Sequence, residues 1–219
     1  MLRPFLAGEL PLYAFVMFIA SIVAALTFHE FAHGFAAYIL GDRTAKQDGR
    51  LSFNPARHID PIGMMLLLVA GFGWAKPVMV NPYNLRNPKQ DMAFISIAGP
   101  VSNFLLAFVV LLIAQALLMF GGTGNAAYYT INFFYLLCSI NIGLGLFNMI
   151  PIPPLDGSKF FGFFLPDPLY FKLMNFRYGM IILIALVFFG EMGNVLWTLV
   201  NTVMDGYTFV IVRILSVFA

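Results

Sequence analysis

The sequence predicts an all-α, polytopic membrane protein, and three observations carry this prediction. Of the 219 residues, 61% are hydrophobic and only 10% are charged, whereas about a quarter are charged in a soluble domain. Several apolar runs approach or exceed the roughly 20 residues that a helix needs to cross a bilayer. Eleven of the twelve Lys and Arg residues fall on one side of the predicted topology. We expect about five transmembrane helices, with six as the alternative, within one membrane-embedded domain, 1–219.

The first span is predicted over residues 12–40, a run long enough to cross with some tilt. It contains the motif His29-Glu30-Phe-Ala-His33, and Gly41-Asp42 ends it. Ionisable groups in an apolar span are costly and usually functional. The motif is therefore the first candidate for a site.

A shorter, mixed region follows at 49–82. Residues 49–54 alternate and end at a proline, which favours a short strand, and 76–81 resembles a second one. The apolar run 62–72 between them is too short to span. We expect a re-entrant or membrane-surface β segment after the first span, covered by protein or facing a water-filled cavity.

Four further apolar runs complete the predicted topology. Pro100 should bend the second span, and a proline-rich turn should end the third. The fourth is short for a crossing, and the fifth carries Asp205 in its middle. The runs are 92–120, 127–150, 178–189 and 194–218.

The distribution of basic residues predicts the orientation. Loops 41–91 and 156–177 hold ten Lys and Arg residues, whereas the connectors at 121–126 and 190–193 hold none. The positive-inside rule places the two basic loops in the cytoplasm and the N-terminus outside. His29, His33 and Asp156 then fall toward the cytoplasmic half of a multi-pass membrane protein.

The H-E-x-x-H spacing predicts a zinc site. Residues i and i+4 of a helix share one face, so His29 and His33 can bind one metal ion, with Glu30 beside it as a general base. Zinc in such a site acts as a Lewis acid and lowers the pKa of its water to about 7.

A catalytic zinc needs a third protein ligand. The single cysteine, Cys138, offers no cysteine-based site. Asp156 is the best candidate because it follows the proline-rich turn at the same membrane depth; Asp205 and His58 are weaker rivals. Asn148 or Asn103 could donate an N–H to the oxyanion of the reaction.

Three motifs in this order resemble the site-2 protease family of intramembrane zinc metalloproteases. They are the motif at 29–33, Gly99-Pro-Val-Ser-Asn103, and Asn148-Met-Ile-Pro-Ile-Pro-Pro-Leu-Asp156-Gly157. The resemblance implies a catalytic core at about 12–160, with accessory helices at about 178–218. The resemblance implies one Zn²⁺ bound by His29, His33 and Asp156, Glu30 as base, and Asn148 assisting the oxyanion. It is closest to a compact branch from bacteria and archaea, which implies a prokaryotic cell membrane and no PDZ or CBS domain.

The implied function is hydrolysis of peptide bonds within or near membrane spans, after local unwinding of the substrate helix. An edge at residues 50–53 or 77–80 could hold the opened segment by β-addition. The expected partners are a transmembrane protein or peptide and the lipid bilayer; the net charge of +2 gives no reason to expect nucleic acid. The alternative is a zinc-binding membrane protein without proteolysis, either an inactive relative or a metal transporter. The oligomeric state is not indicated.

Overall fold

The fold is a bundle of apolar helices joined by short connections. The computed structural model describes residues 11–70, 73–121 and 124–218, and its regular elements there are all helical. Four helices are long and apolar enough to cross a membrane. They are α2 (Leu12–Ile39), α5 (Pro88–Phe120), α6 (Asn125–Asn148) and α10 (Met192–Leu215). The all-α, multi-span prediction is confirmed.

A fifth crossing depends on two shorter helices. α8 (Asp167–Met174) and α9 (Gly179–Phe189) are bent by 64° at a short break, so they form one span only if the bent pair crosses together. The described residues therefore fit four or five crossings and offer no sixth. This bend also explains why the sequence run at 178–189 looks short for a span.

The region after α2 is helical where it is regular. It contains α3 (Thr44–Gln47), α4 (Pro61–Ala70) and two 3-10 turns, η1 (Pro55–Arg57) and η2 (Pro82–Asn84). The predicted strands at 49–54 and 76–81 are wrong, since neither is a strand, and residues 71–72 of the predicted segment lie outside the described ones. The physical reason is that N–H groups of 76–81 are donated to a loop carbonyl and two carboxylates, not to a neighbouring strand.

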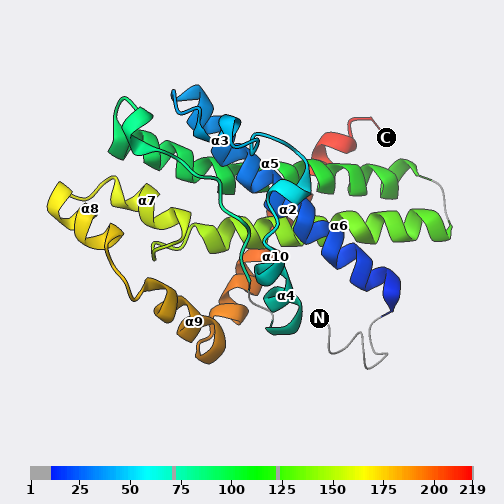
Figure 1. Ribbon diagram of the computed structural model, residues 1–219. Helices are drawn as coiled ribbons and strands as arrows, with labels where there is room; N and C mark the ends of the chain where they lie inside the picture. The colour runs from blue at the N-terminus through cyan, green and yellow to red at the C-terminus, as the bar shows by residue number, and fades with distance from the viewer. Residues whose placement is uncertain (1–10, 71–72, 122–123, 219) are drawn as a thin grey trace.

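Helices α5 and α6 form the centre of the bundle. They run side by side, α2 crosses them, and α10 packs against both (Figure 1). Small and branched residues interlock where α5, α6 and α10 meet. This core consists of Ala107, Val110, Leu111, Leu137, Cys138, Ile142, Val200, Ile211 and Leu215.

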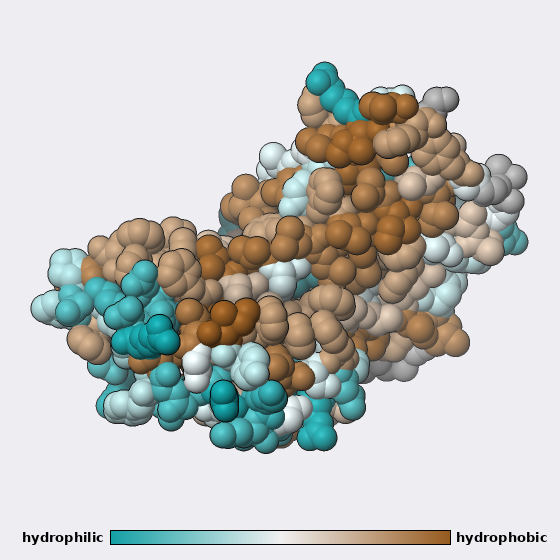
Figure 2. All heavy atoms as spheres, turned by 90° about the horizontal axis from the view of Figure 1, so that it is seen from above, coloured by the Kyte–Doolittle hydropathy of each residue, from teal (hydrophilic) through white to brown (hydrophobic). Residues whose placement is uncertain are grey.

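The outer surface suits a lipid environment. Many large apolar side chains of the long helices are exposed, among them Leu105, Val109 and Leu118 on α5. Figure 2 shows this hydrophobic surface as broad and continuous, with hydrophilic side chains gathered toward the end that carries α3 and α8 in Figure 1. Apolar area of this extent on the outside indicates a multi-pass membrane protein.

A buried carboxylate ties the end of α2 to the segment that returns toward α5. Asp42 is fully buried and accepts hydrogen bonds from the side chains of Thr44 and Asn84 and from the N–H groups of Thr44 and Asn81. Burial alone raises the pKa of Asp42, but these hydrogen bonds outweigh it and hold the pKa below its ordinary value. The link fixes where residues 73–81 lie along α2.

Candidate functional site

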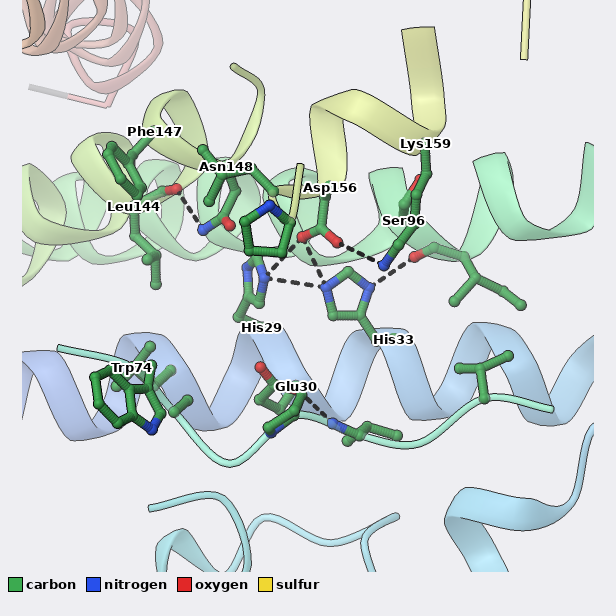
Figure 3. A pocket seen from close by; sticks show the side chains of 18 of the residues that line it. His29, Glu30, His33, Trp74, Ser96, Leu144, Phe147, Asn148, Asp156 and Lys159 are labelled. Atoms are coloured by element: carbon green, nitrogen blue, oxygen red, sulfur yellow. Dashed lines mark hydrogen bonds and ion pairs between the residues drawn. The ribbon is translucent and has the colours of Figure 1, made fainter. Parts of the chain in front are cut away.

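Three ligand atoms from distant parts of the chain converge between α2 and α5. Nε2 of His29 and Nε2 of His33 lie 3.0 Å apart, and Oδ2 of Asp156 lies 3.1 Å from the first and 3.0 Å from the second. The three side chains point toward one another (Figure 3), and His29 and Asp156 are buried while His33 is partly buried. The structure thus brings together the two motif histidines and the aspartate that follows the proline-rich turn.

Hydrogen bonds on the far side of each ring fix which nitrogen carries the proton. Nδ1 of His29 lies 2.7 Å from Oδ1 of Asn103, and Nδ1 of His33 lies 2.7 Å from the carbonyl oxygen of Ile95. Both oxygens are acceptors, so each Nδ1 is the donor. In the neutral rings, both Nε2 atoms then present lone pairs toward each other and toward the carboxylate.

This donor set fits a cation. Two imidazole lone pairs and a carboxylate oxygen at one point repel one another unless a positive charge lies between them. Tetrahedral zinc with bonds of about 2.0–2.2 Å holds its ligands about 3.3–3.5 Å apart, close to the separations found here. The residues present therefore fit a zinc ion with one position left open.

Gly99 makes room for the two rings. A Cβ at this position would lie 2.5 Å from Nε2 of His33 and 2.6 Å from Cε1 of His29. The backbone of α5 therefore forms the wall against which both histidines rest. Pro100 follows and has no N–H, so the carbonyl of Ser96 has no helical donor at this turn.

The turn between α6 and α7 (Asp156–Gly162) brings Asp156 to the histidines. Prolines 151, 153 and 154 end α6 and form the irregular turn that leads into α7. Gly157 then packs directly on the end of α6, since a Cβ there would lie 2.3 Å from the carbonyl oxygen of Met149. The second carboxylate oxygen of Asp156, Oδ1, faces Nζ of Lys159 at 3.8 Å. Only Oδ2 of Asp156 therefore lies close to the two histidines.

Glu30 lies beside the three ligands and has one hydrogen-bond partner among the described residues. Its Oε2 accepts the backbone N–H of Val78 at 2.8 Å (Figure 3). The segment 73–81 runs past α2 without helical or strand structure. The carboxylate of Glu30 is therefore oriented by backbone rather than by another charge.

The site opens into a cavity of about 540 Å³. Its walls come from α2, α5, α6, the start of α7 and residues 73–80, with Met180 and Leu183 of α9 at its edge. Asn148 also lines it and donates one amide hydrogen to the carbonyl of Leu144 at 3.0 Å, which leaves a second hydrogen for another acceptor. Glu30 and the three ligands therefore line one cavity together with Asn148.

The hydrogen bonds of Asn103 differ from those of the predicted oxyanion donor. Its amide nitrogen donates to the carbonyl of Ala25 at 3.1 Å and to Oδ1 of Asn141 at 2.8 Å, while its oxygen accepts from His29. Both amide hydrogens are used, so this side chain has none to offer an oxyanion. Asn103 and Asn141 are fully buried, and together they hold the ring of His29 rather than face the cavity.

The two rival ligands lie elsewhere. His58 is buried in the loop before α4 and donates from Nε2 to the carbonyl of Ser52 at 2.7 Å. Asp205 is exposed on α10. Neither belongs to the group of ligand atoms at His29.

Sequence reasoning missed four features of the site: the wall formed by Gly99, the N–H of Val78, the second amide at Asn141, and Lys159 behind Asp156. Gly99 stands in a quoted motif, and Lys159 stands one helical turn after Asp156, so both had a signal. The contacts of Val78 and Asn141 depend on tertiary packing and had none.

Comparison with known proteins gives a family match and several relatives. Residues 17–190 match the family described as Peptidase family M50. The protein named "Putative zinc metalloprotease YwhC" of Bacillus subtilis is 39% identical over 199 residues, covering 89% of this chain and 90% of the relative. No solved structure gives a significant match.

Two further relatives carry the same type of name. "Putative zinc metalloprotease Rip2" of Mycobacterium tuberculosis is 34% identical over 163 residues, which are 69% of this chain and 60% of that protein. A zinc metalloprotease named in the same way from Methanocaldococcus jannaschii is 30% identical over 155 residues, which are 68% of this chain and 72% of the relative.

Proposed function

The chain belongs to peptidase family M50, and from that membership we propose that it is an intramembrane zinc metalloprotease that hydrolyses peptide bonds within or near transmembrane segments. The observation that carries the proposal is the convergence of His29, His33 and Asp156 on one point inside a membrane bundle, with Glu30 beside them. His29, His33 and Asp156 would hold the zinc ion, which would supply Lewis-acid polarisation of the scissile carbonyl and a more acidic water molecule.

The chain's own residues supply the proton transfers. Glu30 takes a proton from the attacking water and passes it to the leaving amine, and the N–H of Val78 keeps its carboxylate aimed at the cavity. Asn148 donates its remaining amide hydrogen to the oxygen that becomes negative in the tetrahedral intermediate. Asn103 serves as a positioning residue that fixes the His29 ring.

The depth of the site supports cleavage inside the bilayer. His29 lies ten residues before the end of α2 at Ile39, which is about 15 Å along the helix axis. The basic loops lie at that end of α2, so we place the active site toward the cytoplasmic side of a prokaryotic cell membrane. Ligands confined to one depth do not suit a metal transporter, which needs polar groups along its whole path.

The segment 77–80 is the proposed edge that holds an unwound substrate. It lines the cavity, and the N–H groups of Met79 and Val80 have no partner in the described part of the chain. Residues 50–53 do not line the cavity. Successive N–H groups of an extended segment point to opposite sides, so only one of the two can pair with a given substrate strand.

Proline at Met79 and at Val80, one at a time, tests this edge. Alanine at each position controls for the lost side chain. We expect one proline variant to lose most of its cleavage at unchanged zinc content and the other to keep it. Full cleavage by both proline variants would contradict the proposed edge.

Glu30→Gln tests the function itself. The full chain is purified in detergent, its zinc is measured, and cleavage of a membrane peptide with a destabilised helix is followed. We expect equal zinc and a loss of cleavage of about 10²–10⁴-fold, whereas Glu191→Gln, at the start of α10 and outside the cavity, should cleave normally. A wild-type protein that binds zinc but does not cleave the peptide would instead favour a zinc-binding protein without hydrolytic activity.

A further inference from the structure

The outer face of α10 carries a row of polar side chains in a helix that otherwise spans the membrane. Asn194, Thr198, Thr202 and Asp205 are spaced three or four residues apart, so they lie along one side of the helix. All four are exposed. We call them the α10 polar row.

The opposite side of α10 is the one that packs on the bundle. Val200, Ile211 and Leu215 are buried in the core with α5 and α6, and the hydroxyl of Tyr207 donates to the carbonyl of Phe104 at 3.3 Å. These contacts fix the rotation of α10 about its axis, so the exposed polar row faces away from the bundle. If α10 rotated about its axis to bury the polar row, Val200, Ile211 and Leu215 would become exposed.

Asp205 is the residue that needs an explanation. It lies near the middle of α10, which continues unbroken through it, and its carboxylate has no hydrogen bond or ion pair with any described residue. An unpaired charged group in the middle of an apolar span is costly and calls for a compensating partner. A partner outside the described chain would remove that cost.

The row offers acceptors and few donors. The hydroxyls of Thr198 and Thr202 donate back to the carbonyls of Asn194 and Thr198, each at 2.9 Å, and the amide nitrogen of Asn194 donates to Glu191. Their oxygens keep free lone pairs, and a carboxylate is an acceptor only. Next to Asp205, a Cβ on Gly206 would have nothing within 4 Å, so another helix can approach closely.

From this chemistry we propose that the α10 polar row binds a transmembrane helix of another protein that carries a lysine or arginine at mid-membrane depth. Lys and Arg offer only donors and a positive charge, which complement the acceptors and the carboxylate. A second copy of this chain fits less well, because two copies inserted in the same direction would bring Asp205 against Asp205. This interface is separate from the catalytic cavity.

The proposal is tested with a defined probe in vesicles of neutral phosphatidylcholine. The full chain carries a fluorescent donor at its C-terminus, and synthetic leucine–alanine spans with a central lysine or a central leucine carry the acceptor. Energy transfer reports association. We expect the lysine peptide to bind the wild type about tenfold more tightly than the leucine peptide.

Variants of the full chain assign the preference to Asp205. Asp205→Asn should bring the ratio of the two affinities to about one, and Asp205→Glu should keep it. Asp48→Asn, which removes the same charge from an exposed loop, should keep it as well. Equal binding of the two peptides by the wild type, or a preference that survives Asp205→Asn, would overturn the proposal. So would wild-type copies that associate with each other more tightly than with the lysine peptide.

Discussion

The backbone N–H of Val78 donates to Oε2 of Glu30 at 2.8 Å, across 48 positions of the chain. This bond couples the segment that lines the cavity to the proposed general base. A substrate that shifts residues 73–81 would therefore also shift the carboxylate of Glu30.

Removing this N–H should impair catalysis without removing the metal. We expect Val78→Pro to lower kcat about tenfold or more, because the base loses the donor that orients it. Val78→Ala keeps the N–H and should cleave almost normally. The check is kcat and zinc content measured on the same preparations; equal kcat in the two variants would show that the N–H has no role.

A methyl group on Gly99 should destroy the metal site. The Cβ would lie 2.5 Å from Nε2 of His33, so the rings must move away from Asp156. We expect Gly99→Ala to retain less than about a tenth of the zinc of the wild type, a loss in the range found when metal-site geometry is disturbed. Zinc per chain, measured by elemental analysis after gel filtration, decides this.

Gly143→Ala is the matched control for that substitution. Gly143 lies on α6, and a Cβ there would lie 3.7 Å from its nearest neighbour, an ordinary contact. It should keep full zinc. A Gly99→Ala protein that keeps full zinc would mean that the rings have room that the structure does not show.

The two buried amides should tune metal affinity. Asn141→Leu removes the acceptor of one Asn103 hydrogen, and Asn103→Leu removes the partner of His29. We expect zinc affinity to fall about 10–100-fold for Asn103→Leu and by less for Asn141→Leu, with the double variant no worse than the first. Competition with a zinc chelator measures the affinities. Asn132→Leu, which removes an exposed amide on α6, should leave zinc affinity unchanged. Additive losses in the double variant would show that Asn141 does not act on the metal site through Asn103.

Asp42 should give the folded chain a stability that acid removes. Its pKa is lowered on folding, so its contribution is complete above the pKa of the unfolded chain, about 3.9, and is lost as the pH falls through the lower folded value. Asp42→Asn should cost about 2 kcal/mol at pH 7 and flatten this acid dependence.

Thermal unfolding in detergent between pH 3 and pH 7 provides the test. Asp48→Asn, on the exposed loop nearby, should follow the wild type at every pH. A constant difference between Asp42→Asn and the wild type over this range would show that Asp42 does not titrate with unfolding.

The sequence predicted those parts of the molecule that depend on local rules. The i, i+4 spacing of His29 and His33 and the proline-rich turn before Asp156 are local, and the structure brings these three residues together. The long apolar runs likewise became the helices α2, α5, α6 and α10. These features could be predicted because helix geometry, proline chemistry and hydrophobicity are properties of a short stretch of sequence and do not depend on its tertiary contacts.

The failures concern groups whose partners are distant in sequence. Residues 76–81 have the composition of a strand, but their N–H groups bind Glu30, Asp42 and the carbonyl of His58 instead. Asn103 looked free to serve an oxyanion, and only the folded chain shows that Ala25 and Asn141 take its hydrogens. Local pattern cannot reveal such competition.

The order of the ligands along the chain has a consequence for biosynthesis. His29, Glu30 and His33 are synthesised first, and Asp156 follows 123 residues after His33. A nascent or truncated chain that ends before this turn carries the base but only two of the three ligands. If the proposed function holds, a chain that ends before α7 should therefore lack both the complete zinc site and the activity that depends on it.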